Sequence, residues 1–180
     1  APLAGFVWRV VSDPYVGQLV FVRICGGTMK ADSEVLNATK GEKERIVSVL
    51  SVNGKTQATL ENATAGDIIA LSKLKHTKLN DALCSPSHKF AFMALSFPNP
   101  VMAYSVRAKS RGDEDKIGTA LARVADDDPT IRVERNGETH ETLLWGMGDV
   151  HLDVAVEQMK SRSNVEVLLS TPKVPYRETV

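Results

Sequence analysis

Apolar and polar positions alternate over short runs in the first half of the chain, the pattern of half-buried β-strands. Turn signals such as Asn53-Gly54 and Ala65-Gly66-Asp67 separate these runs, and no stretch before residue 85 keeps a 3.6-residue apolar period. The predicted strands cover residues 5–11, 19–25, 34–39, 45–52, 56–60, 67–74 and 88–96. Many short strands joined by turns predict a β-barrel or a sandwich over residues 1–96.

A pair of prolines, Pro98 and Pro100, marks the predicted boundary to a second domain over residues 98–175. Each proline fixes its own φ and disfavours helix at the residue before it. The turn at 13–17 is expected to join the first two strands.

Two helical periods appear in the second domain. The first follows a candidate N-cap, Asp113, and ends before Pro129; its apolar face is Ile117, Ala120, Leu121 and Val124. The second runs from about residue 148 to 162, with Leu152, Ala155, Val156 and Met159 on one stripe. Predicted strands at 101–108, 130–135, 139–145 and 164–170 complete the order βαββαβ, which predicts a ferredoxin-like domain. The fold class is therefore mixed β and α+β.

Charge is balanced over the whole chain, with 22 basic and 22 acidic side chains, but it is divided along the sequence. Residues 71–111 have a balance of +6, whereas residues 112–157 have a balance of −8. Solvated surface explains such a division, and so does a docking face that orients the chain against a charged, RNA-rich partner. The composition, 43% hydrophobic and 24% charged, is that of a globular protein.

Several kinds of chemistry are not predicted. Cys25 and Cys84 are too few and too distant for a disulfide framework or a CxxC zinc site, the four histidines are scattered, and no apolar run is long enough to cross a membrane. Neither GxxxxGK[ST] nor GxGxxG occurs, so we expect no bound nucleotide or cofactor. The strands at 130–135 and 139–145 lack the aromatic pattern of an RNA-recognition motif. We expect a cytoplasmic protein that is not itself an enzyme.

Three charged groups remain as candidates. Lys40, Lys43 and Arg45 lie on a predicted hairpin connection, where they are either solvated or contact phosphates beside Glu42 and Glu44. The acids at 126–128 close the first helix, either as a solvated end or as a contact for a basic partner. His151 lies beside the apolar stripe of the second helix, either as a half-buried edge residue or as a contact at a domain interface.

Three stretches resemble the elongation factor G family of translational GTPases. DPYVGQLVFVRICGGTMKADSEVLNATKGEKERI (13–46) is similar to the second, barrel domain of that family. ARVADDDPTIRV (122–133) and GMGDVHLDVAVEQMK (146–160) are similar to its third domain, and VPYRET (174–179) to the exit from it. The resemblance covers essentially the whole chain.

The resemblance implies a fragment of a ribosome-dependent GTPase that promotes translocation during protein synthesis. The GTPase domain, with its GTP and Mg²⁺, is expected before Ala1, and a fourth and a fifth domain after Val180. Residues 176–180 are then expected to begin the linker to the fourth domain. The implied partners are small-subunit ribosomal RNA for the barrel, and a small-subunit protein and the GTPase domain for the third domain. For contacts of the barrel with this rRNA, our candidates are the three cations of the hairpin connection, Lys40, Lys43 and Arg45.

The resemblance also implies an interdomain pocket that binds fusidic acid in the family. The matching positions are Pro98, Pro100, Thr130, His151, Ala155 and Gln158. Ala155 and Gln158 depart from the larger aliphatic residue and the Arg usual there, and Trp145 is closer to divergent paralogues. Alternative functions are a ribosome-recycling or otherwise specialised paralogue, and a free-standing RNA-binding or ribosome-assembly protein.

Overall fold

The computed structural model describes residues 1–13 and 17–176. The chain divides into two units, unit 1 (Ala1–Ser96) and unit 2 (Phe97–Val180). Residues 14–16 of the expected turn, and all of the expected linker at 176–180 except Tyr176, lie outside the described residues.

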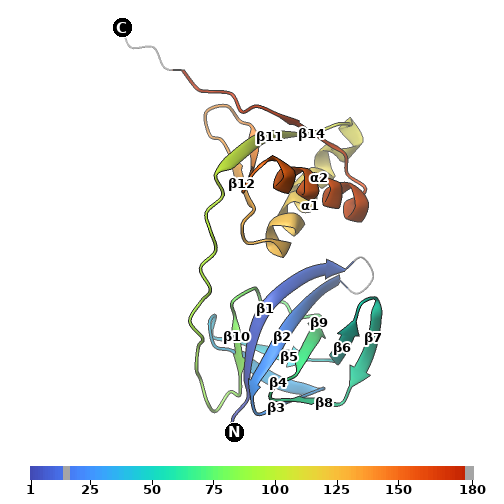
Figure 1. The fold of residues 1–180 in the computed structure, drawn as a ribbon, viewed down its shortest axis with the longest axis vertical. Coiled ribbons are helices and arrows are strands. Elements are labelled where there is room, and N and C mark those ends of the chain that lie inside the picture. Colours follow the sequence, from blue (N-terminus) through green and yellow to red (C-terminus); the bar gives the residue numbers. More distant parts are fainter. Residues whose placement is uncertain (14–16, 177–180) are drawn as a thin grey trace. The chain divides into compact units, whose positions relative to one another are not determined.

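Unit 1 is an antiparallel sheet of eight strands in the order β5-β4-β10-β1-β2-β9-β6-β7, with a separate ribbon of β3 and β8 (Figure 1). The strands are β1 (Ala4–Asp13), β2 (Gly17–Gly26), β3 (Thr28–Lys30), β4 (Ser33–Asn37), β5 (Glu42–Ile46), β6 (Val49–Asn53), β7 (Thr56–Leu60), β8 (Asn62–Thr64), β9 (Ile68–Ser72) and β10 (Ala82–Cys84). The long β1–β2 hairpin forms the middle of the sheet.

Alternating side chains of the curved sheet fill the core of unit 1. Val20, Val22 and Ile24 on β2 all point inward and are fully buried. Met29 of β3 and Ala63 of β8 belong to the same core, so the short ribbon also covers it. The sheet ends at β5 and β7, so the predicted barrel is confirmed in the form of an open half-barrel.

Unit 2 has the predicted ferredoxin-like order. Its elements are β11 (Met102–Ala108), the short helix η1 (Arg111–Asp113), α1 (Glu114–Asp127), β12 (Arg132–Arg135), β13 (Thr142–Gly146), α2 (Asp149–Ser163) and β14 (Val167–Ser170). The four strands form an antiparallel sheet in the order β12-β13-β11-β14, and both helices cover one face of it (Figure 1). Leu121, Leu144, Leu152 and Met159 are buried between the helices and the sheet.

Two strand predictions are wrong. Residues 88–96 form no strand, because their backbone pairs with no neighbouring strand. Their apolar side chains pack instead: the Phe92 ring lies edge-to-face against both Phe90 and Phe6. The expected strand at 45–52 is divided between β5 and β6, which pair with different neighbours, β4 for the first and β7 and β9 for the second. The three-residue strands β3, β8 and β10 carried too little pattern to be predicted.

Candidate functional sites

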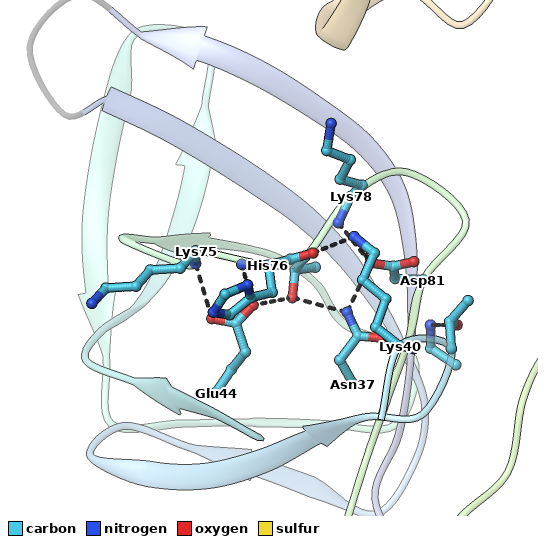
Figure 2. Close-up of polar contacts among 10 residues, drawn as sticks. Asn37, Lys40, Glu44, Lys75, His76, Lys78 and Asp81 are labelled. Atoms are coloured by element: carbon cyan, nitrogen blue, oxygen red, sulfur yellow. Dashed lines mark hydrogen bonds and ion pairs between the residues drawn. The ribbon is translucent and has the colours of Figure 1, made fainter. Parts of the chain in front are cut away.

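The candidate cations of unit 1 lie on the β4–β5 hairpin, where a tight turn follows Asn37. The amide of Gly41 donates to the Asn37 carbonyl oxygen, and the amide of Lys40 donates to the Asn37 side chain. Gly41 has φ of 76°, a conformation that favours glycine. This turn points Lys40 toward His76 and Asp81 (Figure 2), and Lys43 follows at an exposed position of β5.

The three cations have different surroundings. The Lys40 ammonium contacts the Asp81 carboxylate at 3.1 Å and donates to the His76 carbonyl oxygen, so it is part of a local network (Figure 2). Lys43 pairs with Glu34 at 2.8 Å and Arg45 with Asp32 at 3.5 Å, and all four side chains of these two pairs are more than half exposed. The hairpin therefore presents Lys43 and Arg45 outward, whereas Lys40 attaches the tip of the hairpin to the loop that contains His76 and Asp81.

Glu44 organises the loop that follows β9. Its carboxylate accepts from the amides of Lys75 and His76, both at 2.9 Å, and from the Thr77 hydroxyl at 2.7 Å (Figure 2). Burial would raise the pKa of Glu44, but these donors outweigh it, and the pKa lies below its usual value. The Lys75 side chain points away from the carboxylate (Figure 2).

Asp81 completes this network from the far end of the same loop. It is 3% exposed and accepts from the Asn37 amide group and the Lys78 amide, both at 2.7 Å, as well as from Lys40. The sequence analysis assigned neither acid a role. The signal for Glu44 was an acid at an inward-facing position of the alternating strand β5, where it lies two residues before the buried Ile46.

In unit 2 an acid at the end of α1 connects two of the predicted site residues. Asp128 accepts at one oxygen from the amide and the hydroxyl of Thr130, at 2.8 and 2.6 Å. Its other oxygen lies 3.1 Å from Nε2 of His151. Burial would raise the pKa of Asp128, but the Thr130 donors and His151 outweigh it and lower the pKa.

His151 is held at both ring nitrogens. The amide of Met147 donates to Nδ1 at 3.0 Å, so the proton of the neutral ring is on Nε2 and points to Asp128. The close approach depends on Gly146, where a Cβ atom would lie 2.7 Å from Leu152 and 3.2 Å from His151 Nδ1. The His151 side chain keeps 23% of its surface exposed, which leaves a ring edge for further contact.

The other predicted pocket residues are not part of this hydrogen-bond network. Pro98 and Pro100 lie on the extended segment before β11. Ala155 is buried in the core of unit 2, and Gln158 is half-buried one turn further along α2. Of the predicted pocket residues, the structure therefore connects Thr130 and His151, through Asp128. The sequence Asp-Pro-Thr at the end of a helix could have indicated this role of Asp128, because an Asp side chain there often accepts from the backbone two residues on.

The described residues hold no cluster of three or more His, Cys, Asp or Glu side chains suited to a metal ion. No helix in the described part of the chain is long and apolar enough to span a membrane.

Comparison with known proteins assigns each unit separately. Residues 2–86 match the family model "Elongation factor G domain 2", and residues 97–171 match "Elongation Factor G, domain III". The chain is 39% identical to elongation factor G of Cereibacter sphaeroides, 40% to that of Paracoccus denitrificans and 41% to that of Dinoroseobacter shibae. Each alignment covers 99% of this chain and 25% of the relative.

A solved structure from Thermus thermophilus shows the same fold. It superimposes with a TM-score of 0.84 at 32% identity, covering 98% of this chain and 27% of that one. The chain thus spans about a quarter of the length of the relatives it matches. The half-barrel and the βαββαβ domain follow one another in the order of the two family models that they match. The chain therefore belongs to the elongation factor G family, of which it contains domains 2 and III.

Proposed function

We propose that this chain is the ribosome-docking and GTPase-coupling part of an elongation factor that promotes translocation in the cytoplasm. The observation that carries this proposal is the succession of family domains 2 and III within one chain, 99% of which aligns with a quarter of elongation factor G. GTP hydrolysis and Mg²⁺ binding are assigned to the GTPase domain of the whole factor. The chain itself contributes binding surfaces and no catalytic group.

The half-barrel docks on small-subunit ribosomal RNA through the β4–β5 hairpin. Lys43 and Arg45 are exposed, and their acidic partners are exposed as well. Such surface pairs are worth about 1 kcal/mol or less, so an RNA phosphate can replace the carboxylate at small cost. Lys40 positions the hairpin tip through Asp81.

Domain III couples the GTPase domain to a small-subunit protein. Thr130 and His151 lie together on one surface through Asp128, and this surface is proposed to meet the GTPase domain. His151 acts there as a contact residue, because both of its ring nitrogens already have partners within unit 2. The fusidic-acid pocket is proposed at the same surface, with Pro98, Pro100 and Gln158; Ala155, which is buried in the core, would act there only through the packing of α2.

The test is binding of the chain to purified small ribosomal subunits over a range of salt concentrations. Replacing Lys43 and Arg45 by Gln is expected to weaken binding and to reduce the slope of log K against log salt by about 0.7 to 0.9 for each lost phosphate contact. Lys55→Gln, in the β6–β7 turn, is the matched control that removes a cation of the same half-barrel. Absence of any binding by the unmodified chain would refute the proposed docking function.

A further inference from the structure

Strand β1 contains a β-bulge that changes which side chains face outward. Val7 pairs with Val22, but the next pair is Arg9 with Phe21, so Trp8 is an extra residue in β1. In a regular strand Val7 and Arg9 would share a face, because side chains alternate. Instead Val7 and Val10 are both buried, at 0% and 4%, and Trp8 and Arg9 both face outward.

The neighbouring strand adds an aromatic ring and a second arginine to the same face. The Phe21 ring lies 5.8 Å from the Trp8 ring, centroid to centroid. Arg23, two residues further along β2, is exposed and pairs with Phe6 of β1. We call Trp8, Arg9, Phe21 and Arg23 the aromatic–arginine face; it lies on the middle hairpin of unit 1, away from the Lys43 hairpin in strand order. Phe6 is not part of this face, because the Phe92 ring packs against it.

This face carries uncompensated positive charge. Among the described residues no carboxylate forms an ion pair with Arg9 or Arg23. Trp8 keeps 39% of its surface exposed, although a large aromatic ring gains from burial. Unit 2 offers a contrast, because Arg132 lies 5.1 Å from the Trp145 ring centroid and also pairs with Glu134.

We propose that the aromatic–arginine face binds single-stranded RNA. Unpaired bases stack on Trp8 and Phe21, and phosphates pair with Arg9 and Arg23. Aromatic rings beside guanidinium groups are the surface that binds unpaired nucleotides with little sequence preference. A protein partner would need acidic groups to match both arginines, whereas RNA supplies one negative charge at every nucleotide. The inference rests on the proposed function for the source of the RNA, but it concerns a different surface.

The first experiment uses Trp8 as the probe. In the Trp145→Phe variant Trp8 is the sole tryptophan, and its fluorescence is expected to be quenched when a single-stranded oligouridylate or oligoadenylate of about 12 nucleotides is added, a length within the usual site size. A blunt RNA duplex of the same length is expected to quench much less, because its bases are already stacked.

The second experiment measures the affinity of variants with a labelled oligonucleotide. Trp8→Ala is expected to weaken binding at least about fivefold, since stacking of one base contributes that much, whereas Trp8→Phe retains most of the affinity. Arg9→Gln with Arg23→Gln is expected to weaken binding and to reduce the salt slope by about 1.4. Arg132→Gln with Trp145→Phe is the matched control in unit 2 and should leave the affinity unchanged.

Three results would overturn the inference: no quenching of Trp8, equal loss in the matched control, or equal affinity for the duplex. Shielding of Trp8 from acrylamide in the full-length factor without RNA would also overturn it, because another domain would then cover the face. If small subunits bind the chain but oligonucleotides do not, this inference fails alone. If oligonucleotides bind through Trp8 but small subunits do not, only the proposed docking function fails.

Discussion

Glu44 in unit 1 and Asp128 in unit 2 are both carboxylates that accept several hydrogen bonds, but they differ in how far they are buried. Each carboxylate gathers donors from a neighbouring segment, and in each the donors lower the pKa against the effect of burial. Glu44 is 5% exposed and fixes three consecutive residues, whereas the Asp128 side chain is 41% exposed and joins Thr130 to His151.

The difference in exposure gives the two carboxylates different roles: Glu44 stabilises the fold of unit 1 from a buried position, whereas Asp128 connects two residues at the surface of unit 2. Water can replace the donors of the half-exposed Asp128 carboxylate when they are lost, but it cannot easily reach the buried Glu44 carboxylate. Glu44 therefore anchors residues 75–77 to β5, whereas the Asp128–His151 contact of unit 2 lies at the surface. Because Trp8 lies in unit 1 and Trp145 in unit 2, the Trp145→Phe and Trp8→Phe backgrounds let fluorescence follow unit 1 and unit 2 separately, and the variants below are compared in these backgrounds.

The largest expected effect is that of Glu44→Ala. It leaves two partly buried amides and the buried Thr77 hydroxyl without their acceptor, and an unsatisfied buried group costs about 1–3 kcal/mol. We expect unit 1 to lose about 3 kcal/mol or more of its free energy of unfolding, measured by urea denaturation followed at Trp8. Glu42→Ala, at an exposed position of the same strand, is expected to change it by less than about 0.5 kcal/mol. Equal effects of the two substitutions would show that Glu44 is no anchor.

Acid should destabilise unit 1 through the same residue. The pKa of Glu44 in the folded state lies below the ordinary glutamate value of 4.5, so its ionised form stabilises the fold. This contribution is fully present above about pH 4.5 and is lost as the pH falls through the lowered pKa. Urea midpoints at pH 7 and pH 3 are expected to differ less in Glu44→Gln than in the unmodified chain. A difference of the same size in both would contradict the assignment.

Asp128→Ala is expected to have a smaller effect, on unit 2 only. Loss of the Thr130 and His151 contacts should reduce its free energy of unfolding by about 1–2 kcal/mol, because both donors are only partly buried and water can take the place of the carboxylate. Denaturation followed at Trp145 measures this change, and Glu157→Ala on the exposed face of α2 is the control. A loss as large as that of Glu44→Ala would remove the distinction between the two carboxylates.

The smallest expected effects compare two lysines of one hairpin. Lys40→Met should cost about 1 kcal/mol, because the buried Asp81 loses its cation but keeps the Asn37 and Lys78 donors. Lys43→Met removes only an exposed pair and should cost about 0.5 kcal/mol or less. Equal losses of unfolding free energy for the two substitutions would show that Lys40 contributes no more than an ordinary surface lysine.

Local pattern was sufficient to predict most elements. Both helices of unit 2 and their apolar stripes follow from the spacing of residues such as Leu121, Leu152 and Met159. Local pattern failed where residues distant in sequence determine whether a segment forms a strand. The apolar run at 88–96 contacts Phe6 through an aromatic ring but pairs with no strand. The run at 45–52 is divided because β5 and β6 pair with different strands.

The sequence by itself determined the two-domain order, the βαββαβ succession and the resemblance to elongation factor G, because these depend on period and motif along the chain. Tertiary structure decided what each charged side chain does. Lys40 and Lys43 are three residues apart, yet one contacts a buried carboxylate and the other an exposed one. The bulge at Trp8 likewise needs the register with β2. Hydrogen-bond partners, burial and register join residues distant along the chain, so they exist only once the sheet has formed.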